Sequence, residues 1–481
     1  MKNVMLIYPP GELFQRGEDR CQSNIKSSTA TSIRACNDLG YCASVLKNTY
    51  NIFLKDYQTE NLSFEDLKRD FEKIKPDVLF VSVTNTTIFK DLEIINALNP
   101  SCCTILKGAV FYNPEDEMLN MLDLKNIDYL IATEAECIIK DLIEAHFNDK
   151  SKLKEINGIV YKENNKWIKT NFDIRFEDLD LLPFPDRDLM NNMLYTLPDT
   201  GEVQATIATS RGCPSSCIYC LTPKLTGRKL RLRSAKNIFD ELLECYKKYN
   251  IKNFFFKSDT FTMNKEWTIE LCNYIINSEL NKKIKWVANS RVNPIDEETL
   301  LKMKQAGCHL IAFGFESGSE KSLINMKKGA VIEQNIKAAK MAKKAGLQIY
   351  GFYLIGFPWE DMSDLKKTED LIFKINADFI ELHIAAPFYG TELYNLAKKE
   401  GLIDESILGK DYFNSPTLGT KYLTIKQINE FRRKIILKYH LRPSYILKKL
   451  YGAIFKPKVL LNYFKYGIRL IKNNMGIVNN D

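Results

Sequence analysis

Three cysteines within eight residues are the feature of this sequence that most clearly predicts chemistry. They lie in "SRGCPSSCIYC", residues 210–220, at Cys213, Cys217 and Cys220, and Tyr219 precedes the last of them. Thiolates are soft ligands that suit zinc and iron–sulfur clusters. A structural zinc site takes four protein ligands, whereas this loop has three and the next histidine in the chain is His309.

The absence of a fourth ligand favours an iron–sulfur cluster. Three thiolates on a 4Fe–4S cluster would leave one iron without a protein ligand, and a substrate or cofactor could chelate that iron. The spacing of three and then two intervening residues lets one loop wrap a cluster. A zinc loop and a set of buried thiols remain the alternatives.

The elements that would position this loop form a series of strands and helices between residues 201 and 400. The loop follows the first of six apolar segments, which are "QATIATS", "NFFFKSD", "KWVANSR", "LIAFGFE", "IYGFYLIG" and "FIELHIAA". Helical sequence separates each from the next. The pattern predicts a partial (β/α)6 barrel of the TIM type, in which the active site lies at the carboxyl ends of the strands.

The rest of the chain predicts three further regions in an α/β protein. Residues 1–148 alternate buried strands and helices, as in a Rossmann-like parallel sheet whose ligands bind outside the carboxyl ends of the strands. Residues 149–200 contain a hairpin, "NGIVYKENNKWIKT", and a linker interrupted by prolines. Residues 401–481 are helical and basic.

Composition limits the class of protein. A chain of 481 residues is too long for one core, and 45% hydrophobic with 27% charged residues is typical of a folded protein. The sequence contains no apolar run of about 18 residues, so no membrane span is predicted. The segment "MKNVMLIYPP" resembles a strand more than a signal peptide. We therefore expect reduced thiols and a cytoplasmic location, with the other nine cysteines serving as small buried residues.

Positive charge is concentrated at the C-terminus. From Lys421 to the end there are 14 Lys and Arg and two acidic residues, a net charge of +12, whereas the whole chain carries +8. Tyr, Phe, Leu and Ile are interspersed, a composition typical of a helix lying on an anionic membrane. A basic helix that packs on the body of the protein explains the pattern equally well. Nucleic acid is disfavoured because the aromatic residues lack a sheet on which bases could stack.

The cysteine spacing, Cys-x-x-x-Cys-x-aromatic-Cys, resembles the motif of the radical SAM family. The resemblance implies that S-adenosylmethionine (SAM) binds the open iron through its amino and carboxylate groups. An electron from the cluster would then cleave SAM to a 5′-deoxyadenosyl radical. Tyr219 would lie near the adenine, and a donor such as flavodoxin or ferredoxin would reduce the cluster.

The ends of the next four strands resemble the cobalamin-linked branch of that family. The segments are "FFFKSDTFTMNKEW", "VANSRVN", "FGFESGSEKSLINMKKG" and "YLIGFPWE". The resemblance places polar residues at the mouth of the barrel and a glycine beside adenine, with Glu316 and Ser317 facing the ribose and carboxylate of SAM; the set is Asp259, Asn289, Arg291, Glu316, Ser317 and Gly356. Each residue alone is an ordinary strand-end group, but their shared position favours a site.

Residues 1–148 resemble the cobalamin-binding module of the same branch, which implies contacts from Asp56, Ser82 and Gly108. Two departures matter. The family's Asp-x-His-x-x-Gly is "DYQTEN" here, with Gln58 in place of the histidine, and a glycine pair is replaced by "KGA", with Lys107. No histidine precedes His146, so bound cobalamin would be base-off without a histidine ligand. A scaffold domain that binds no cobalamin is the alternative.

The resemblance implies a radical SAM enzyme that methylates an unactivated carbon, with one SAM methylating cobalamin and a second forming the radical. Oxidative cyclases and rearrangement enzymes belong to the same branch, and the sequence does not separate them from methylases. A cluster-bearing scaffold or electron-transfer protein would need the cysteines but not Asp259, Arg291 and Glu316. The substrate is expected to be a small molecule or lipid, since "HLRPSYIL" is similar to C-terminal segments of members that act on apolar molecules. Peripheral contact with the inner membrane surface would follow.

Overall fold

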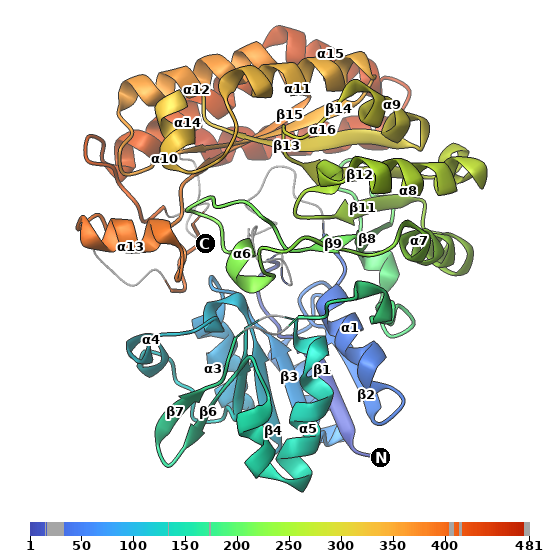
Figure 1. Cartoon of the computed structure of the whole chain (residues 1–481), viewed down its shortest axis with the longest axis vertical. Helices are drawn as coiled ribbons and strands as arrows, with labels where there is room; N and C mark the ends of the chain where they lie inside the picture. The colour runs from blue at the N-terminus through green and yellow to red at the C-terminus, as the bar shows by residue number, and fades with distance from the viewer. Residues whose placement is uncertain are drawn as a thin grey trace.

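The computed structural model has two α/β lobes, drawn one above the other in Figure 1, with the N-terminal lobe below. It describes residues 1–14, 16, 33–132, 134–172, 175–403, 408–412 and 416–475. Each lobe is built on a sheet of parallel strands, so the predicted α/β class is confirmed. Among the described residues, no helix has the length and apolar character needed to cross a membrane.

The N-terminal lobe contains a seven-stranded sheet in the order β2-β1-β3-β4-β5-β6-β7. The first five of these strands are parallel, and β6 and β7 pair antiparallel at one edge. Their bounds are β1 Asn3–Tyr8, β2 Asn51–Asp56, β3 Val78–Ser82, β4 Cys103–Lys107, β5 Tyr129–Ile131, β6 Ile159–Glu163 and β7 Lys166–Lys169. The order reverses between β1 and β3, which is the point where sheets of this kind bind ligands.

One boundary expected from the sequence is corrected by this sheet. The hairpin of β6 and β7 was placed with the linker at 149–200, but β6 pairs with β5 and extends the N-terminal sheet. An antiparallel hairpin shows its own turn in the sequence, but the sequence does not show which sheet edge it joins. The N-terminal sheet therefore extends beyond residue 148 and ends at Lys169.

Helices cover both faces of the N-terminal sheet. On one face, α1 (Asn37–Leu46) and α5 (Ile139–Asn148) pack on the strands. On the other lie α2 (Phe64–Ile74), α3 (Ile88–Leu98) and α4 (Asp116–Asn120). Strands β3 and β4 are buried along their whole length, as their continuous apolar sequences predict for a parallel sheet covered on both sides.

The second lobe contains six parallel strands that follow chain order, β8-β11-β12-β13-β14-β15. The strands are β8 Gln204–Ala208, β11 Asn253–Lys257, β12 Lys285–Ser290, β13 Cys308–Glu316, β14 Gln348–Ile355 and β15 Phe379–Ile384. Helices α7 (Ala235–Tyr249), α8 (Lys265–Asn277), α9 (Glu297–Gln305), α11 (Ile332–Lys344) and α12 (Met362–Ile375) connect them. In this order β8 and β15 are the two edges of the sheet.

The two faces of this sheet differ in packing. On β15, Ile380, Leu382 and Ile384 are buried in the core shared with the helices, whereas Glu381 and His383 point to the other side and are about a quarter and a fifth exposed. Strand β14 alternates in the same way. We call this second side the inner face. A closed β/α barrel fills its interior with packed side chains, but here the inner face retains accessible polar groups.

The C-terminal region is helical, as predicted from its sequence. It contains α13 (Glu392–Lys399), α14 (Ile425–His440), α15 (Pro443–Ala453) and α16 (Pro457–Met475). Helix α14 packs on the second lobe through Ile428, Ile435 and Tyr439, and the Tyr439 hydroxyl donates a hydrogen bond to the Ala377 carbonyl at 2.6 Å. Part of the basic region is therefore a packing element of the second lobe.

Candidate active site

The cysteine loop starts directly after β8, on a short antiparallel ribbon formed by β9 (Ser210–Arg211) and β10 (Arg231–Leu232). Gly212 opens the loop with a φ of +89°, and a Cβ there would lie 2.1 Å from the Lys229 carbonyl oxygen. Only glycine fits such a position without a shift of the backbone. The Cys213 amide then donates a hydrogen bond to the Gly227 carbonyl at 3.0 Å.

Backbone hydrogen bonds hold the middle of the loop from two sides. The Ile218 amide donates to the Met326 carbonyl at 3.1 Å, and the Leu393 amide donates to the Ile218 carbonyl at 3.0 Å. Met326 follows the short helix α10 (Glu320–Asn325), and Leu393 lies at the start of α13. The loop between the cysteines is therefore fixed by segments more than 100 residues later in the chain.

The three thiols lie in a partly enclosed loop. Cys213 and Cys217 are buried and Cys220 is half-buried. Within the described parts of the chain, no group of three Cys, His, Asp or Glu side chains is arranged to hold a metal ion. In a 4Fe–4S cluster each of the three thiolates would bind a different iron.

Arg291 and Glu316 meet beside the loop through Lys328. One Arg291 guanidinium nitrogen lies 3.8 Å from the Cys217 sulfur, and the other donates a hydrogen bond to the Lys328 carbonyl. The Lys328 ammonium contacts the Glu316 carboxylate at 2.6 Å in a buried pair. A Cβ on Gly314 would lie 2.4 Å from that carboxylate, so glycine makes room for it. Two predicted residues are thus brought to the cysteines.

Tyr219 connects the loop to the end of β14. Its ring packs edge to face on Phe357, with the centroids 5.8 Å apart. Burial raises the pKa of Tyr219 well above its ordinary value, and the negative charges of Glu316, Cys217 and Cys220 add to this effect. The phenol is therefore neutral at physiological pH. Phe357 follows Gly356, the residue expected near adenine.

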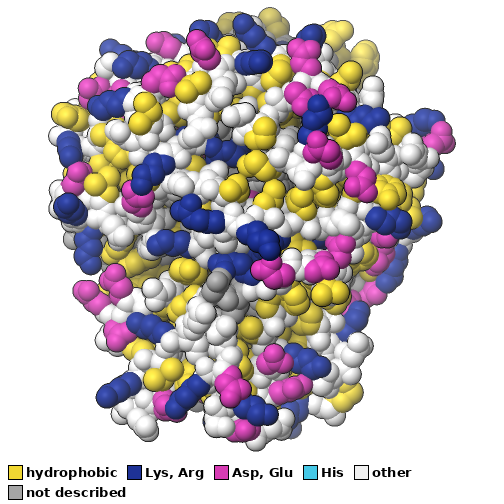
Figure 2. Space-filling model, viewed as in Figure 1, with side chains coloured by type: hydrophobic (Ala, Val, Ile, Leu, Met, Phe, Trp, Pro, Cys, Tyr) yellow, Lys and Arg dark blue, Asp and Glu magenta, His cyan; other side chains and the backbone are white. Residues whose placement is uncertain are grey.

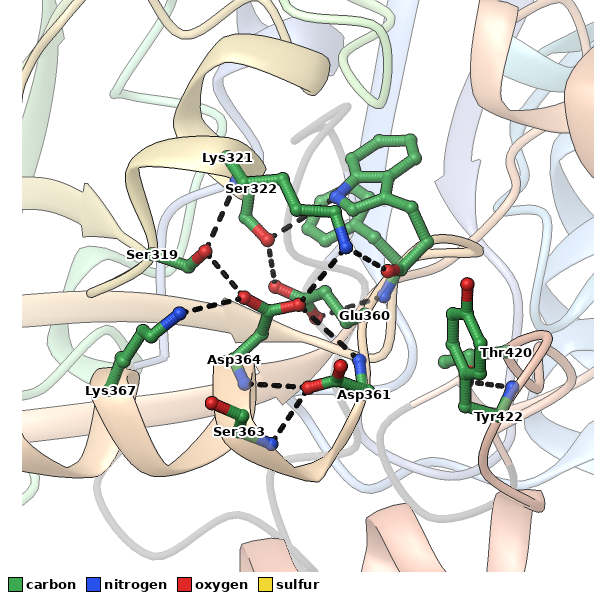
Figure 3. Close-up of polar contacts among 12 residues, drawn as sticks. Ser319, Lys321, Ser322, Glu360, Asp361, Ser363, Asp364, Lys367, Thr420 and Tyr422 are labelled. Atoms are coloured by element: carbon green, nitrogen blue, oxygen red, sulfur yellow. Dashed lines mark hydrogen bonds and ion pairs between the residues drawn. The ribbon is translucent and has the colours of Figure 1, made fainter.

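Glu360 holds the turn that contains Gly356. One Glu360 oxygen accepts hydrogen bonds from the backbone amides of Gly356 at 2.7 Å and Phe357 at 3.1 Å. The other accepts a hydrogen bond from the Ser322 hydroxyl at 2.6 Å, a contact drawn in Figure 3. Gly356 has a φ of +86°. Burial raises the pKa of Glu360 to about 7, although these hydrogen bonds oppose the effect.

Ser317 is placed differently from the other predicted residues. Its side chain is fully buried, and its hydroxyl lies 3.1 Å from the Thr368 hydroxyl on α12. Figure 3 shows a parallel contact one turn away, where the Ser319 hydroxyl donates to Asp364 at 2.7 Å. These bonds fasten the end of β13 to α12, and the structure does not bring the Ser317 side chain to the cysteines.

Asp259 and Asn289 lie at the same end of the sheet. Asp259 follows β11 and accepts a hydrogen bond from Thr226, within the cysteine loop, at 3.3 Å. Asn289 is partly exposed near the end of β12. The predicted second-lobe residues therefore all lie at the carboxyl ends of the strands, although the Ser317 side chain turns toward α12.

A polar group on the inner face was not identified as a site from the sequence. The Glu381 carboxylate accepts a hydrogen bond from the Tyr350 hydroxyl and lies 2.7 Å from Nε2 of His383. Burial would raise the pKa of Glu381, but His383, Tyr350 and the Arg34 guanidinium hold it below its ordinary value. The alternation of "FIELHI" could have revealed that Glu381 and His383 share a face, although not that Tyr350 joins them.

A second group missed by the sequence reading joins the two lobes at the cysteine loop. Arg231 binds both oxygens of Glu134, at 2.5 and 3.1 Å, and Arg211 reaches Glu134 at 3.3 Å and Glu136 at 2.5 Å. Arg211 and Arg231 are directly paired in the ribbon. Like charges opposite each other are unfavourable, so the two glutamates of the N-terminal lobe stabilise the base of the loop.

The predicted cobalamin residues lie at the carboxyl edge of the N-terminal sheet. Ser82 donates a hydrogen bond to Asp38 at 2.8 Å, and Lys107 lies 3.4 Å from the same carboxylate. A Cβ on Gly108 would be 2.9 Å from Val83, so this glycine allows a close approach. Burial raises the pKa of Asp56, which ends β2 and accepts a hydrogen bond from the Thr59 amide at 2.9 Å.

Gln58, in the position of the family's histidine, is held by other groups. Its side-chain carbonyl accepts a hydrogen bond from Arg16 at 3.0 Å, and its side-chain amide donates to the backbone carbonyl of Glu12. Arg16 also forms a fully buried ion pair with Asp91 at 2.8 Å. No histidine lies at this edge in the part of the chain that the structure describes. The residues present therefore fit a corrinoid without an imidazole ligand.

The two carboxyl edges face one another where the lobes meet. Asn37, at the start of α1, donates a hydrogen bond to the Thr206 carbonyl on β8 at 2.8 Å, and Arg187 in the connecting segment joins Thr206 to Glu241 of α7. Figure 2 shows both signs of charge mixed over one face of the molecule, with Lys and Arg side chains gathered near this junction.

Comparison with known proteins defines the class of this site. Residues 207–372 match the model of the Radical SAM superfamily. An uncharacterized methyltransferase of Pyrococcus horikoshii is 30% identical over 452 residues, which cover 93% of this chain and 94% of the relative. The anaerobic magnesium-protoporphyrin IX monomethyl ester cyclase of Rubrivivax gelatinosus is 25% identical over 368 residues, which cover 74% of this chain and 65% of the relative.

The fold agrees with that assignment. The cobalamin-dependent SAM radical enzyme OxsB, solved with aqua-cobalamin and SAM, superposes with a TM-score of 0.73 at 17% identity, covering 99% of this chain and 72% of OxsB. The protein is a radical SAM enzyme. Within that superfamily, the chain belongs to the family of the Pyrococcus horikoshii methyltransferase, which it matches over 93% of its length.

Proposed function

We propose that this enzyme transfers a methyl group from SAM to an unactivated carbon of a hydrophobic substrate. The proposed architecture is a partial (β/α)6 barrel of the TIM type behind a Rossmann-like cobalamin domain. One observation carries the proposal most directly: Arg291 reaches the Cys217 sulfur, and Tyr219 lies near Glu316, Cys217 and Cys220 at neighbouring strand ends. A scaffold protein would have no use for these additional groups.

The cysteine loop would hold a 4Fe–4S cluster, which supplies the electron that breaks a carbon–sulfur bond of SAM. Cys213, Cys217 and Cys220 would each bind one iron. The Arg291 guanidinium, 3.8 Å from the Cys217 sulfur, would offset the negative charge of a thiolate-bound cluster. The Glu316–Lys328 pair would offer an acceptor and a donor to the polar end and the ribose of SAM.

The adenine would lie against Tyr219 and the turn at Gly356. Both are fixed before SAM arrives, because Phe357 contacts the Tyr219 ring and Glu360 binds the amides of the turn. Pre-formed contacts lower the entropy cost of binding. Asp259 and Asn289 complete the rim of the proposed site.

The N-terminal lobe would hold cobalamin, which serves as the methyl carrier when bound. Asp56, Ser82 and Gly108 are the proposed contacts. Ser82 and Lys107 present a hydroxyl and an ammonium at the edge, and Gly108 leaves space beside Val83. We infer base-off binding, because Gln58 replaces the histidine and is engaged by Arg16.

The substrate would lie between the lobes, against the inner face. Val287, Phe352 and Leu354 are partly exposed there, and these side chains support a hydrophobic substrate, with lipids included. A flavodoxin or ferredoxin would reduce the cluster from the cytoplasm. We also infer that the C-terminal region contacts the inner surface of the membrane.

An oxidative cyclase is the second candidate, and the Glu381–His383 pair is the observation that favours it. Transfer of a methyl group to a carbon radical needs no proton acceptor, whereas an oxidative cyclisation releases protons. The His383 imidazole, 2.7 Å from the Glu381 carboxylate, is a group that would accept such a proton. The cyclase relative supports the same alternative.

Product stoichiometry separates the two candidates. The protein is purified anaerobically, its cluster is reconstituted, and it is supplied with hydroxocobalamin, a chemical reductant, deuterated-methyl SAM and a cell extract as substrate source. A methyltransferase forms S-adenosylhomocysteine and 5′-deoxyadenosine together and labels a product with deuterium. A cyclase forms 5′-deoxyadenosine and methionine without S-adenosylhomocysteine. The Cys217→Ala protein controls for background cleavage, and absence of both products from the intact enzyme would contradict either proposal.

A further inference from the structure

Helices α15 and α16 present an exposed apolar surface. Of 22 large hydrophobic residues exposed in the described part of the chain, nine lie between 446 and 468: Ile446, Leu447, Leu450, Tyr451, Ile454, Phe455, Leu461, Phe464 and Ile468. Phe455, in the turn between the helices, is 93% exposed. Single exposed hydrophobics are normal, but a contiguous group marks an interaction surface.

Positive charge accompanies these residues. The segment from Pro443 to Met475 contains seven Lys and Arg residues and no Asp or Glu. On α16, Leu461, Phe464 and Ile468 recur at helical spacing on the exposed side, together with Lys458, Lys465 and Lys472. An apolar stripe with flanking lysines is typical of helices that lie in the interface of an anionic bilayer.

The orientation of this hairpin is fixed by its other side. Asn462 donates a hydrogen bond to the Asp199 carbonyl at 2.7 Å, and the Tyr466 hydroxyl donates to the Pro198 carbonyl at 2.8 Å. On α15, the Tyr445 hydroxyl bonds the Asp378 carbonyl at 3.1 Å, and Lys448 pairs with the Asp378 carboxylate at 2.7 Å. The apolar side chains therefore point outward from a docked hairpin.

We propose that this surface, which we call the docking face, binds an anionic lipid membrane. It consists of Leu447, Tyr451, Ile454, Phe455, Leu461, Phe464 and Ile468 with Lys456, Lys458, Lys465 and Lys472. Charge complementarity selects this occupant. A second copy of the chain would bring the same cations together in a symmetric contact. Anionic headgroups instead attract each lysine, while the bilayer boundary buries the apolar side chains.

The docking face lies at the opposite end of the second lobe from the cysteine loop. Its contacts at 198–199 precede β8 and those at Asp378 precede β15, so they mark the amino ends of the two edge strands. The cysteines follow the carboxyl end of β8, and five residues of strand span roughly 17 Å. Binding of the docking face to a membrane would anchor the enzyme, while the mouth of the candidate active site faces away from the bilayer.

This inference deepens the proposed membrane contact and is independent of the methyltransferase chemistry. It also implies that membrane binding does not itself deliver a substrate to the site, since a lipid would have to leave the bilayer to reach the cysteine loop. Failure of membrane binding would leave the chemistry untouched, and failure of the chemistry would leave the docking face untouched.

Vesicle flotation of the full chain tests the proposal. Vesicles of phosphatidylcholine with 30% phosphatidylglycerol are compared with pure phosphatidylcholine, in low and in 0.5 M salt. We expect flotation with the anionic vesicles at low salt and its loss at high salt, because salt screens exposed charges. Phe464→Asp and Lys465→Glu should each weaken partitioning at least tenfold. Leu301→Asp on α9 and Lys68→Glu on α2, both exposed, are the matched controls and should float as the natural chain does.

Several outcomes would overturn the proposal. The natural chain could remain with the soluble fraction on anionic vesicles at low salt. Phe464→Asp could float as well as the natural chain, which would assign membrane binding to another surface. Light scattering could show a dimer that Phe464→Asp converts to a monomer, which would assign the face to a second copy. Circular dichroism and iron content of each variant distinguish lost binding from lost folding.

Discussion

The carboxyl edges of the two sheets are built differently, although both are expected to hold a cofactor. In the second lobe, residues from the cysteine loop and from several strand ends meet around Cys217, and each is recognisable from a motif. In the N-terminal lobe, Asp38, Lys107 and Gln58 occupy the edge with contacts among protein groups. Covalent ligation of a cluster demands particular atoms, whereas a large cofactor held by many weak contacts tolerates replacement of individual residues.

Loss of one thiolate from the cysteine loop should have the largest effect on activity. Cys217→Ala should abolish formation of 5′-deoxyadenosine in the reconstituted enzyme, because two thiolates cannot hold the cluster with a single open iron. Liquid chromatography with mass spectrometry measures the product, and iron analysis measures the cluster. Full SAM cleavage in this variant would show that the cysteine loop is not the cluster site. Cys272→Ala, which removes a buried thiol elsewhere, should retain the activity.

Removal of Glu134 tests the contact by which one lobe supports the other. Glu134→Ala leaves Arg231 and Arg211 without their shared carboxylate, and the loss of one partner from a buried pair costs about 3–5 kcal/mol. Thermal unfolding should begin at lower temperature, and cluster content should fall. Glu279 is the matched control, since it also has a positive φ but pairs with Lys282 on the surface. Glu279→Ala should leave thermal unfolding and cluster content nearly unchanged, because exposed ion pairs add little to stability. Equal effects of the two substitutions would show that Glu134 does not support the cysteine loop.

Glu360 predicts a pH dependence of stability that originates in the second lobe. Its pKa is raised by burial to about 7, so the folded protein holds this proton more tightly than the unfolded chain does. Its contribution to stability is therefore complete below the ordinary carboxyl pKa and is lost as the pH rises through about 7. The total is about 3 kcal/mol by linkage.

Comparison with Glu360→Gln isolates this contribution, because glutamine does not titrate. The difference in free energy of unfolding between the natural chain and the variant should change between pH 5 and 8 in the direction of a less stable natural chain. Urea unfolding at several pH values measures it. A constant difference across that range would show that Glu360 stays ionised in the folded protein.

The smallest expected effect concerns the N-terminal lobe. If cobalamin binds as proposed, the cob(II)alamin form should show no nitrogen superhyperfine splitting in its electron paramagnetic resonance spectrum, because Gln58 is held by Arg16 and no imidazole lies at the edge. The Gln58→Ala substitution removes a hydrogen-bond partner of Arg16 and should leave that spectrum unchanged. Splitting from an axial nitrogen in the natural chain would contradict the assignment, and absence of any bound corrinoid would favour the scaffold alternative.

Local patterns predicted much of the fold. The six strands of the second lobe were recognised from apolar runs separated by helical sequence, and the order of pairing follows chain order. The sequence predicts the hairpin of β6 and β7 but not the sheet that it joins, because its pairing with β5 depends on an edge that only the folded sheet presents.

The candidate site shows the same limit. The motif predicts that Glu316 and Ser317 face SAM, and in the structure Glu316 lies near the cysteine loop, whereas the Ser317 side chain turns toward Thr368 on α12. A motif specifies the backbone of a strand end but not the direction of each side chain, which depends on the helix packed behind it. Tyr350 joins Glu381 from the adjacent strand, and no spacing in the sequence predicts that partner.

The sequence by itself determined the chemistry of this protein, because the three thiols and the aromatic residue act through short spacings along one loop. It also determined the basic and apolar character of the C-terminus. Only the tertiary structure decided what these features face. Glu134 reaches Arg231 across 97 residues of sequence, and the docking face lies at the end of the second lobe opposite the cysteines. Such relations depend on how distant segments pack, and packing is a property of the folded chain as a whole.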